Sequence, residues 1–225
     1  MRVLRGRAAT ADADRERTGA MLARTGETGE PAVRVWTPGR QVAFGRREAA
    51  ESGYDRARAA ARERDFLPVE RRVGGRAVAY TGTTLAFAHA VPVTDARTGL
   101  AERYEETTER LRRALSNLGV ETAVGEPPES FCPGTHSLQS GGKLVGVAQR
   151  VRTDAALVAG CVLVTDREEL ASVLAAVYDA LDQPFDPQSV GSVAAAGGPA
   201  DPDRVRTAVE RELVGDAAAV CRIEV

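Results

Sequence analysis

The chain has 225 residues with 30 basic and 32 acidic side chains, which gives a formal net charge of −2. This length can bury a sizeable core without disulfides or metals, and we expect one globular domain as the main unit. The balanced charge excludes the basic field that a nucleic-acid backbone requires. The three cysteines and two histidines show no paired spacing, so we expect no metal site and reduced thiols.

The first residues, 1–6, lack the apolar core of a signal peptide. The longest apolar run, 155–164, is too short to span a bilayer. We therefore expect a soluble, cytoplasmic protein that has neither a membrane nor a nucleic-acid partner.

The first half of the chain alternates between helical and strand patterns. A helix is predicted over 9–25 and stops at the glycines that follow it, and a second helix is predicted over 47–64. Short apolar or alternating runs separated by Pro and Gly predict strands over 33–36 and 42–44, joined by a tight turn. Two further strands are predicted over 77–80 and 85–88, after a run over 69–73 that leads into Gly74 and Gly75.

The second half predicts helices over 100–118, from Asp166 as its cap to about 181, and over 202–214, with strands over 137–139, 144–149 and 156–164. Strands and helices in mixed order, with prominent hairpins, predict an α/β (α+β) fold with a mixed central β-sheet flanked by helices. We expect this domain to cover 1–195, and 196–225 to be a linker and a short C-terminal helix.

Lys143 is the only lysine in the chain. A coding bias toward arginine explains why lysine is rare, but it does not explain why the survivor lies between Gly142 and Gly146 in an apolar, strand-like run. A lysine amine is compact and can lose its proton when buried, whereas a guanidinium stays charged. The setting predicts a site that uses a small ammonium or amine.

An arginine-rich glycine turn forms the second candidate cluster. Arg71 and Arg72 precede Gly74 and Gly75, and Arg76 follows them at the start of a predicted strand. Arginines hold carboxylate or phosphate groups, and a glycine turn lets backbone approach a ligand closely. The same arrangement occurs in ordinary turns, so spacing alone leaves both readings open.

Cys132 forms the third cluster, since it follows a proline-rich loop and precedes Pro133 and Gly134. A thiolate is an effective nucleophile, and either His136 or Lys143 could be the cation that stabilises it. Cys161 and Cys221 fit buried structural positions better, and His89 in its apolar strand fits a structural histidine.

Taken together, these clusters resemble the lipoate–protein ligase and octanoyltransferase family, which shares a catalytic domain with biotin protein ligases. The resemblance covers roughly 8–193. The segment 34–36 with Phe44 and Gly45 looks like the family's N-terminal strand pair, and 71–78 looks like its acyl-binding turn. The segment 143–150, with Gly160 in the next strand, looks like its lysine signature.

Within that family, Cys132-Pro133-Gly134 is similar to the nucleophile segment of cysteine-dependent octanoyl or lipoyl transferases. The resemblance implies that Cys132 forms an acyl thioester, that Lys143 activates the thiol and orients the acyl carbonyl, and that a lysine of a lipoyl-carrier protein then attacks. The carriers it implies are the glycine cleavage H protein and E2 lipoyl domains. It implies substrate contacts from the arginine-glycine turn (Arg71, Arg72, Gly74, Gly75, Arg76) and from Gly146 and Ala148, and no cofactor.

The chain departs from the family pattern at two places. Tyr80 and Thr81 follow the glycine strand where the family often has His or Asp, and Ser137 stands where the acyltransferases tend to have an aspartate. Both departures concern substrate positioning more than reaction class.

Three alternatives stay open. In an ATP- and Mg-dependent lipoate ligase, Lys143 would contact the acyl-adenylate and Cys132 would be incidental, and we expect that 200–225 are too few residues for an accessory adenylation domain. A non-catalytic carrier-binding module is a second alternative, although the presence of both Cys132 and Lys143 argues against it. A biotin ligase is disfavoured because the chain has no Gly-Arg-Gly-Arg type loop.

Overall fold

A large mixed sheet runs through the computed structural model, which describes residues 1–71, 74–217 and 219–224. Its strand order is β11-β1-β2-β6-β10-β9-β8-β7. β1 pairs in parallel with both β2 and β11, and the other pairs are antiparallel. The mixed central sheet predicted from the sequence is therefore confirmed. Its strands are β1 (Arg2–Arg5), β2 (Ala32–Trp36), β6 (Leu85–Pro92), β7 (Ala123–Val124), β8 (Leu138–Gln139), β9 (Lys143–Val151), β10 (Ala155–Val162) and β11 (Cys221–Glu224).

A second, three-stranded sheet has the order β4-β3-β5 and consists of β3 (Gln41–Phe44), β4 (Leu67–Glu70) and β5 (Val78–Tyr80). The sequence predicted β2 and β3 as two strands joined by a tight turn. The structure separates them: β2 pairs with β6 in the large sheet, and β3 pairs with β4 and β5 in the small one. Local turn signals could not reveal this, because each strand finds its partners far along the chain.

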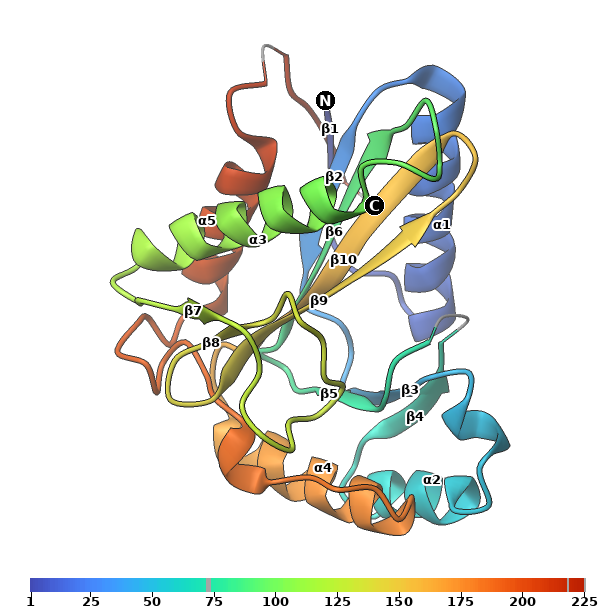
Figure 1. Ribbon diagram of the computed structural model, residues 1–225, viewed down its shortest axis with the longest axis vertical. Helices are drawn as coiled ribbons and strands as arrows, with labels where there is room; N and C mark the ends of the chain where they lie inside the picture. The colour runs from blue at the N-terminus through green and yellow to red at the C-terminus, as the bar shows by residue number, and fades with distance from the viewer. Residues whose placement is uncertain (72–73, 218, 225) are drawn as a thin grey trace.

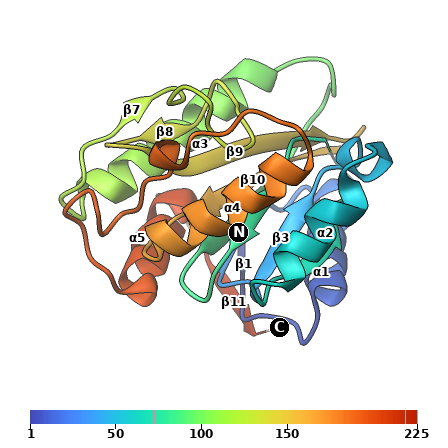
Figure 2. The ribbon, with the colours of Figure 1, turned by 90° about the horizontal axis from the view of Figure 1, so that it is seen from below.

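Within the described residues, five α-helices cover the two sheets (Figure 1): α1 (Ala11–Thr28), α2 (Tyr54–Arg62), α3 (Leu100–Ser116), α4 (Arg167–Ala180) and α5 (Pro202–Val214). α3 and α5 lie together on one face of the large sheet, and α1 lies on the opposite face. α2 and α4 pack side by side over the small sheet (Figure 2). Short 3-10 turns occupy Glu48–Ala50 and Pro187–Ser189. The described part of the chain contains no helix long and apolar enough to cross a bilayer.

Local capping chemistry accounts for the start of α5 but not for the start of α4. Asp201 accepts a hydrogen bond of 2.9 Å from the Asp203 N–H, and Pro202 begins α5, which spans the predicted 202–214. The predicted cap at Asp166 is different: its side chain makes no capping hydrogen bond and instead accepts one from the Thr83 hydroxyl over 2.8 Å. The helix predicted over 47–64 is shorter, because a 3-10 turn and Gly53 precede α2.

The end of the chain packs on the same body as the rest. α5 contributes buried Val205, Val209 and Leu213 to the core beneath α3. β11, which the sequence analysis did not foresee, extends the large sheet beside β1. The division at residue 195 stays a prediction.

Candidate active site

Cys132 lies in the long connection between β7 and β8, with its backbone in the left-handed region at φ +40°. An L-residue rarely adopts this conformation, and such strain tends to persist where surrounding contacts enforce it. The side chain is half-buried, and its Sγ lies 3.0 Å from the position that a Cβ on Gly75 would occupy. The turn that carries Cys132 therefore presents the thiol directly to the glycine turn.

Lys143 begins β9 and points under this turn, with only 1% of its side chain exposed. Its Nζ donates hydrogen bonds to the carbonyl oxygens of Phe131 (3.0 Å) and Cys132 (2.9 Å) and to Glu126 Oε1 (2.8 Å). An ammonium has three donors, so each N–H has a partner. The structure thus brings Lys143 and Cys132 together, with the lysine charge held against the backbone of the cysteine.

Glu126 belongs to the same connection, and sequence reasoning treated its segment only as loop. Its Oε1 accepts hydrogen bonds from Lys143 Nζ, from the Gly134 N–H (2.7 Å) and from the Ser137 hydroxyl. A buried ammonium needs a nearby counter-charge. Once Lys143 was predicted to be functional, a search for an acid in the adjoining loop could have identified Glu126, the acid between Gly125 and Pro127.

Tyr178 of α4 joins the cysteine turn to the opposite wall of the site. Its hydroxyl accepts a hydrogen bond from the Cys132 N–H (2.7 Å) and donates one to the Ala77 carbonyl oxygen (3.1 Å). Burial raises the pKa of Tyr178, so the hydroxyl keeps its proton. This role has no local sequence signal, because Tyr178 lies on the buried face of its helix with Leu174 and Val177.

The arginine-glycine turn forms the wall facing the thiol. Arg71 Nη2 hydrogen-bonds the carbonyl oxygen of Arg76 and lies 3.3 Å from the position of a Cβ on Gly75. Gly75 has φ +92°, which favours glycine, while Gly74 is exposed with open space around it. Gly75 and the Arg71 guanidinium thus lie beside the Cys132 thiol, and Arg76 is joined to Arg71 through its carbonyl oxygen. The predicted site residue Arg72 lies outside the described residues.

A buried carboxylate supports this wall from behind. Glu48 accepts hydrogen bonds from the Gly45 N–H (2.8 Å) and the Ala77 N–H (2.9 Å). Burial raises the pKa of Glu48, while these two backbone donors oppose the rise. A Cβ on Gly45 would collide with the carbonyl oxygen of Gly75, so the two segments pack backbone against backbone.

Gly146 lies beside the Lys143 side chain and not beside the Cys132 thiol. A Cβ there would lie 3.5 Å from Lys143 Cε and 3.6 Å from Cys161 Sγ. Cys161 is buried, as predicted for a structural thiol, and burial raises its pKa. Ala148, two residues further along β9, is exposed and is paired with Ala159 of β10.

His136 does not take part in the Lys143 hydrogen bonds. Its ring stacks on Tyr104 of α3, with the ring centroids 4.2 Å apart and the planes 7° from parallel. The structure therefore places the cation of Lys143, and not the imidazole, against the Cys132 backbone. His89 is buried in β6, as the sequence predicted, and burial lowers its pKa to about 4.

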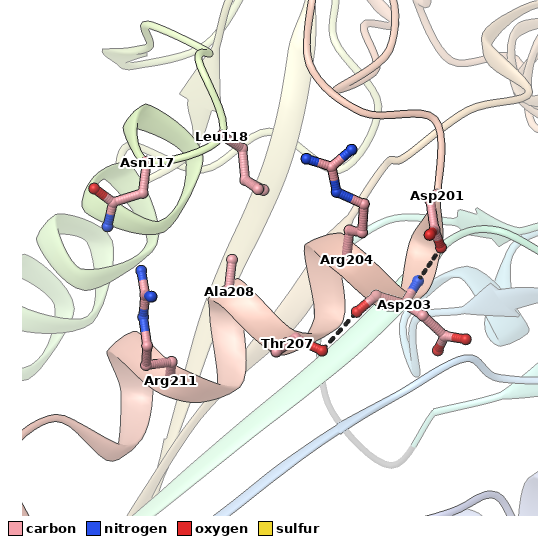
Figure 3. Close-up of a pocket in the computed structure, with 8 residues that line it drawn as sticks. All are labelled: Asn117, Leu118, Asp201, Asp203, Arg204, Thr207, Ala208 and Arg211. Carbon is pink, nitrogen blue, oxygen red and sulfur yellow. Dashed lines mark hydrogen bonds between the residues drawn. The ribbon is translucent and has the colours of Figure 1, made fainter.

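A separate depression of about 430 Å³ lies between the end of α3 and α5. Some of its polar groups already hydrogen-bond each other within α5, since the Thr207 hydroxyl donates to the Asp203 carbonyl oxygen over 2.7 Å (Figure 3). It is lined by Asn117, Leu118, Asp201, Asp203, Arg204, Thr207, Ala208 and Arg211. None of the predicted site residues lines it. Within the described residues, no group of three His, Cys, Asp or Glu side chains could hold a metal ion.

Solved structures share this fold. A lipoate-protein ligase A bound with ATP has a TM-score of 0.79 to this chain at 18% identity, covering 100% of this chain and 88% of that one. The bi-partite lipoate protein ligase of Thermoplasma acidophilum, solved in a study that included its E2 lipoyl domain, has a TM-score of 0.69 at 18% identity, covering 99% and 85%. A biotin protein ligase from Leishmania major has a TM-score of 0.52 at 10% identity, covering 94% and 72%.

A curated relative is the octanoyl-[GcvH]:protein N-octanoyltransferase of Geobacillus kaustophilus, which is 28% identical over 122 residues. This match covers 54% of the present chain and 43% of the relative, so it spans less than half of the relative's length. The family model of the lipoyl protein ligase A/B catalytic domain matches residues 18–214, which include the Cys132 turn, the glycine turn and Lys143. The chain therefore belongs to the lipoyl protein ligase A/B catalytic domain family.

Proposed function

We propose that this protein transfers an octanoyl or lipoyl group to a lysine of a lipoyl-carrier protein through a thioester on Cys132. The observation that carries the proposal is the position of the Cys132 thiol, which faces the Gly75 turn while Lys143 holds the carbonyl of the same residue. A strained backbone at a half-buried cysteine, supported by a buried ammonium, is the setting of an activated nucleophile.

The reaction proceeds in two acyl transfers. The Cys132 thiol gives up its proton and its sulfur attacks the acyl carbonyl carbon of the donor; a carbon–sulfur bond forms, the bond between the acyl carbon and the donor breaks, and the donor group leaves with the proton that the thiol lost. The amine of the acceptor lysine then attacks the thioester; a carbon–nitrogen bond forms, the carbon–sulfur bond breaks, and the amine proton is released. The thiolate is regenerated, so a covalent intermediate divides one difficult transfer into two easier steps.

Lys143 supplies a positive charge beside the nucleophile turn, and an adjacent cation stabilises a thiolate. In the structure its three N–H groups are engaged, so it also fixes the turn that aims the sulfur. Orienting the acyl carbonyl would require one of these hydrogen bonds to be exchanged for the substrate oxygen.

Arg71 is the group we assign to the acyl carbonyl or its oxyanion. Its guanidinium borders Gly75, and its Nε is buried without a hydrogen-bond partner among the described residues. A donor held without an acceptor beside a nucleophile is suited to stabilise developing negative charge. We assign the acyl chain to the turn formed by Gly74, Gly75 and Arg76, with Arg72 as a further contact, and to the β9 side at Gly146 and Ala148.

The partners we propose are lipoyl-carrier proteins, namely the glycine cleavage H protein and E2 lipoyl domains. The name of the Geobacillus kaustophilus relative specifies GcvH, and the Thermoplasma acidophilum ligase was studied with its E2 lipoyl domain. This transfer needs no cofactor, because the donor is already an activated or exchangeable acyl group.

The proposal is tested by incubating the protein with an octanoylated carrier as donor, without ATP, and measuring its intact mass. We expect one octanoyl adduct that is removed by hydroxylamine, is absent in Cys132→Ser, and is retained in the control Cys221→Ser, since Cys221 is exposed and lies on the edge strand β11. Adding an unmodified lipoyl carrier should discharge the adduct onto the carrier lysine.

An ATP-dependent lipoate ligase is the second candidate, favoured by the shared fold with lipoate-protein ligases. Carrier modification that appears only with ATP, Mg and free lipoate, and that survives in Cys132→Ser, would establish the ligase and overturn the transferase. Carrier binding without modification under either condition would instead identify a non-catalytic module.

A further inference from the structure

We propose that Glu126 is a positioning residue for the Cys132 chemistry, and that its negative charge holds Lys143 against the turn that carries the nucleophile. The inference rests on the proposed function for its kinetic consequence. Its structural basis is independent of that function: Glu126 Oε1 accepts hydrogen bonds from both Lys143 Nζ and the Ser137 hydroxyl.

The charge of Glu126 is required by the burial of Lys143. The lysine side chain is 1% exposed, and its other two acceptors are the neutral carbonyls of Phe131 and Cys132. Glu126 is its one salt-bridge partner within the described residues. A buried charge that loses its partner is strongly disfavoured, so Lys143 would leave its position.

The geometry of Glu126 also fixes both sides of the nucleophile. Through Lys143 it holds the carbonyls of Phe131 and Cys132, and through its bond to the Gly134 N–H it holds the chain two residues after the thiol. Its second oxygen, Oε2, is buried and has no partner in the described part of the chain. The carboxylate is therefore committed to one oxygen on which three donors converge.

Ser137 lies where a carboxylate could pair with Lys143 in place of Glu126. It is buried, and its hydroxyl shares an acceptor atom with Lys143 Nζ. An aspartate at 137 in a chain that lacks the Glu126 carboxylate would thus meet the ammonium. Moving the carboxylate from position 126 to position 137 by substitution therefore tests the proposal directly.

The first measurement is steady-state octanoyl transfer by Glu126→Ala, Glu126→Gln and the double variant Glu126→Ala/Ser137→Asp. Misplacing a catalytic group by about 1 Å costs on the order of 100-fold in rate, so we expect kcat of both single variants to fall about 100-fold with little change in KM for the donor. The double variant should recover to within about 10-fold of the unmodified protein. Glu129→Gln, an exposed acid in the same loop, is the control and should keep full activity.

The second measurement uses the fact that Lys143 is the only lysine. Reductive methylation with formaldehyde, followed by peptide mass analysis, reports on Lys143 separately from the N-terminal amine. Lys143 should resist labelling in the unmodified protein and in the double variant. It should be labelled roughly 10-fold faster in Glu126→Ala, because local release opens the site.

These two measurements separate the inference from the proposed function. If the unmodified protein forms no Cys132 adduct, the proposed function fails, and lysine protection still decides whether Glu126 holds Lys143. The positioning role is overturned if Glu126→Ala keeps Lys143 protected from methylation and retains kcat. It is also overturned if the double variant Glu126→Ala/Ser137→Asp has a native circular dichroism spectrum but recovers neither the protection of Lys143 nor kcat. Should Glu126→Ala fail to fold, Glu126→Gln and the double variant carry the same comparison.

Discussion

Lys143 Nζ donates a 2.9 Å hydrogen bond to the carbonyl oxygen of Cys132, the residue whose sulfur faces the glycine turn. The lysine therefore acts on the backbone of the cysteine as well as through its charge. The shape of the lysine side chain is therefore as important to the site as its positive charge.

Lys143→Arg tests that shape. A guanidinium keeps the charge but is planar and larger than the space under the turn, so it cannot reproduce the three convergent hydrogen bonds. We expect transfer activity to fall about 100-fold, while the protein still folds with a free energy of unfolding lowered by about 1–3 kcal/mol through overpacking. Steady-state kinetics and urea denaturation measure the two effects. Arg150→Gln, at an exposed position on the same strand, is the control, and full activity of Lys143→Arg would refute the assignment.

Tyr178→Phe removes the hydroxyl that joins Cys132 to Ala77. The Cys132 N–H and the Ala77 carbonyl would both lose a partner in a buried setting, which costs about 1–3 kcal/mol of unfolding free energy. We also expect slower formation of the acyl adduct, because the cysteine turn is no longer tied to the opposite wall. Tyr54→Phe is the matched control, since it loses a hydrogen bond of 2.8 Å to Glu70 instead. Equal rates of adduct formation in the two variants would argue against a role for Tyr178 in the site.

Gly75→Ala should abolish acyl transfer. Its Cβ would lie 3.0 Å from Cys132 Sγ, and φ +92° is strained for any L side chain. Gly74→Ala is the neighbouring control, because a Cβ there meets nothing within 4 Å. We expect intact-mass measurements to show a Cys132 adduct in Gly74→Ala and none in Gly75→Ala. An adduct of normal yield in Gly75→Ala would mean that the acyl group does not pass this turn.

The burial of His89 predicts that the free energy of unfolding falls at acidic pH. Burial lowers the pKa of His89 from 6.5 to about 4, so the unfolded chain binds a proton at a pH where the folded chain does not. The stability that depends on neutral His89 is complete above pH 6.5 and falls as the pH drops toward 4. Between pH 7 and pH 5 this loss amounts to about 2 kcal/mol.

His89→Leu should reduce the fall in unfolding free energy between those two pH values by that amount, as measured by urea denaturation. His136→Gln is the control, because the chain has only two histidines and the ring of His136 is only half-buried. A pH dependence unchanged in His89→Leu would contradict the buried-histidine explanation.

The elements with strong local patterns could be predicted from the sequence. The helix predicted over 202–214 is confirmed to the residue, and in the structure Asp201, Pro202 and Gly215 mark its ends. β1, β7 and β11 were missed, because strands of two to four residues are too short for their pattern to stand out from the surrounding chain. The separation of β2 from β3 also lay beyond local reasoning, because sheet partners are set by contacts between distant segments.

The site was predicted where a residue type was itself unusual. A lone lysine and a cysteine outside any core pattern led to Lys143 and Cys132. Glu126 and Tyr178 were missed because an acid in a loop and an aromatic on an apolar helix face are common, and their roles follow only from hydrogen bonds made across the fold. His136 was a reasonable candidate by spacing, but stacking on Tyr104 holds its ring on α3.

The burial of Lys143 also has a consequence for self-acylation, the reaction of a protein's acyl thioester with its own lysines. An acyl thioester reacts with lysine amines, and a protein carrying one would ordinarily acylate its own surface. Here the single lysine lies beneath the nucleophile turn with all three of its N–H groups donated, and every other basic side chain is an arginine or a histidine. No lysine amine is left on the surface to intercept an acyl group, so the proposed Cys132 thioester would persist until the lysine of a carrier protein reaches it.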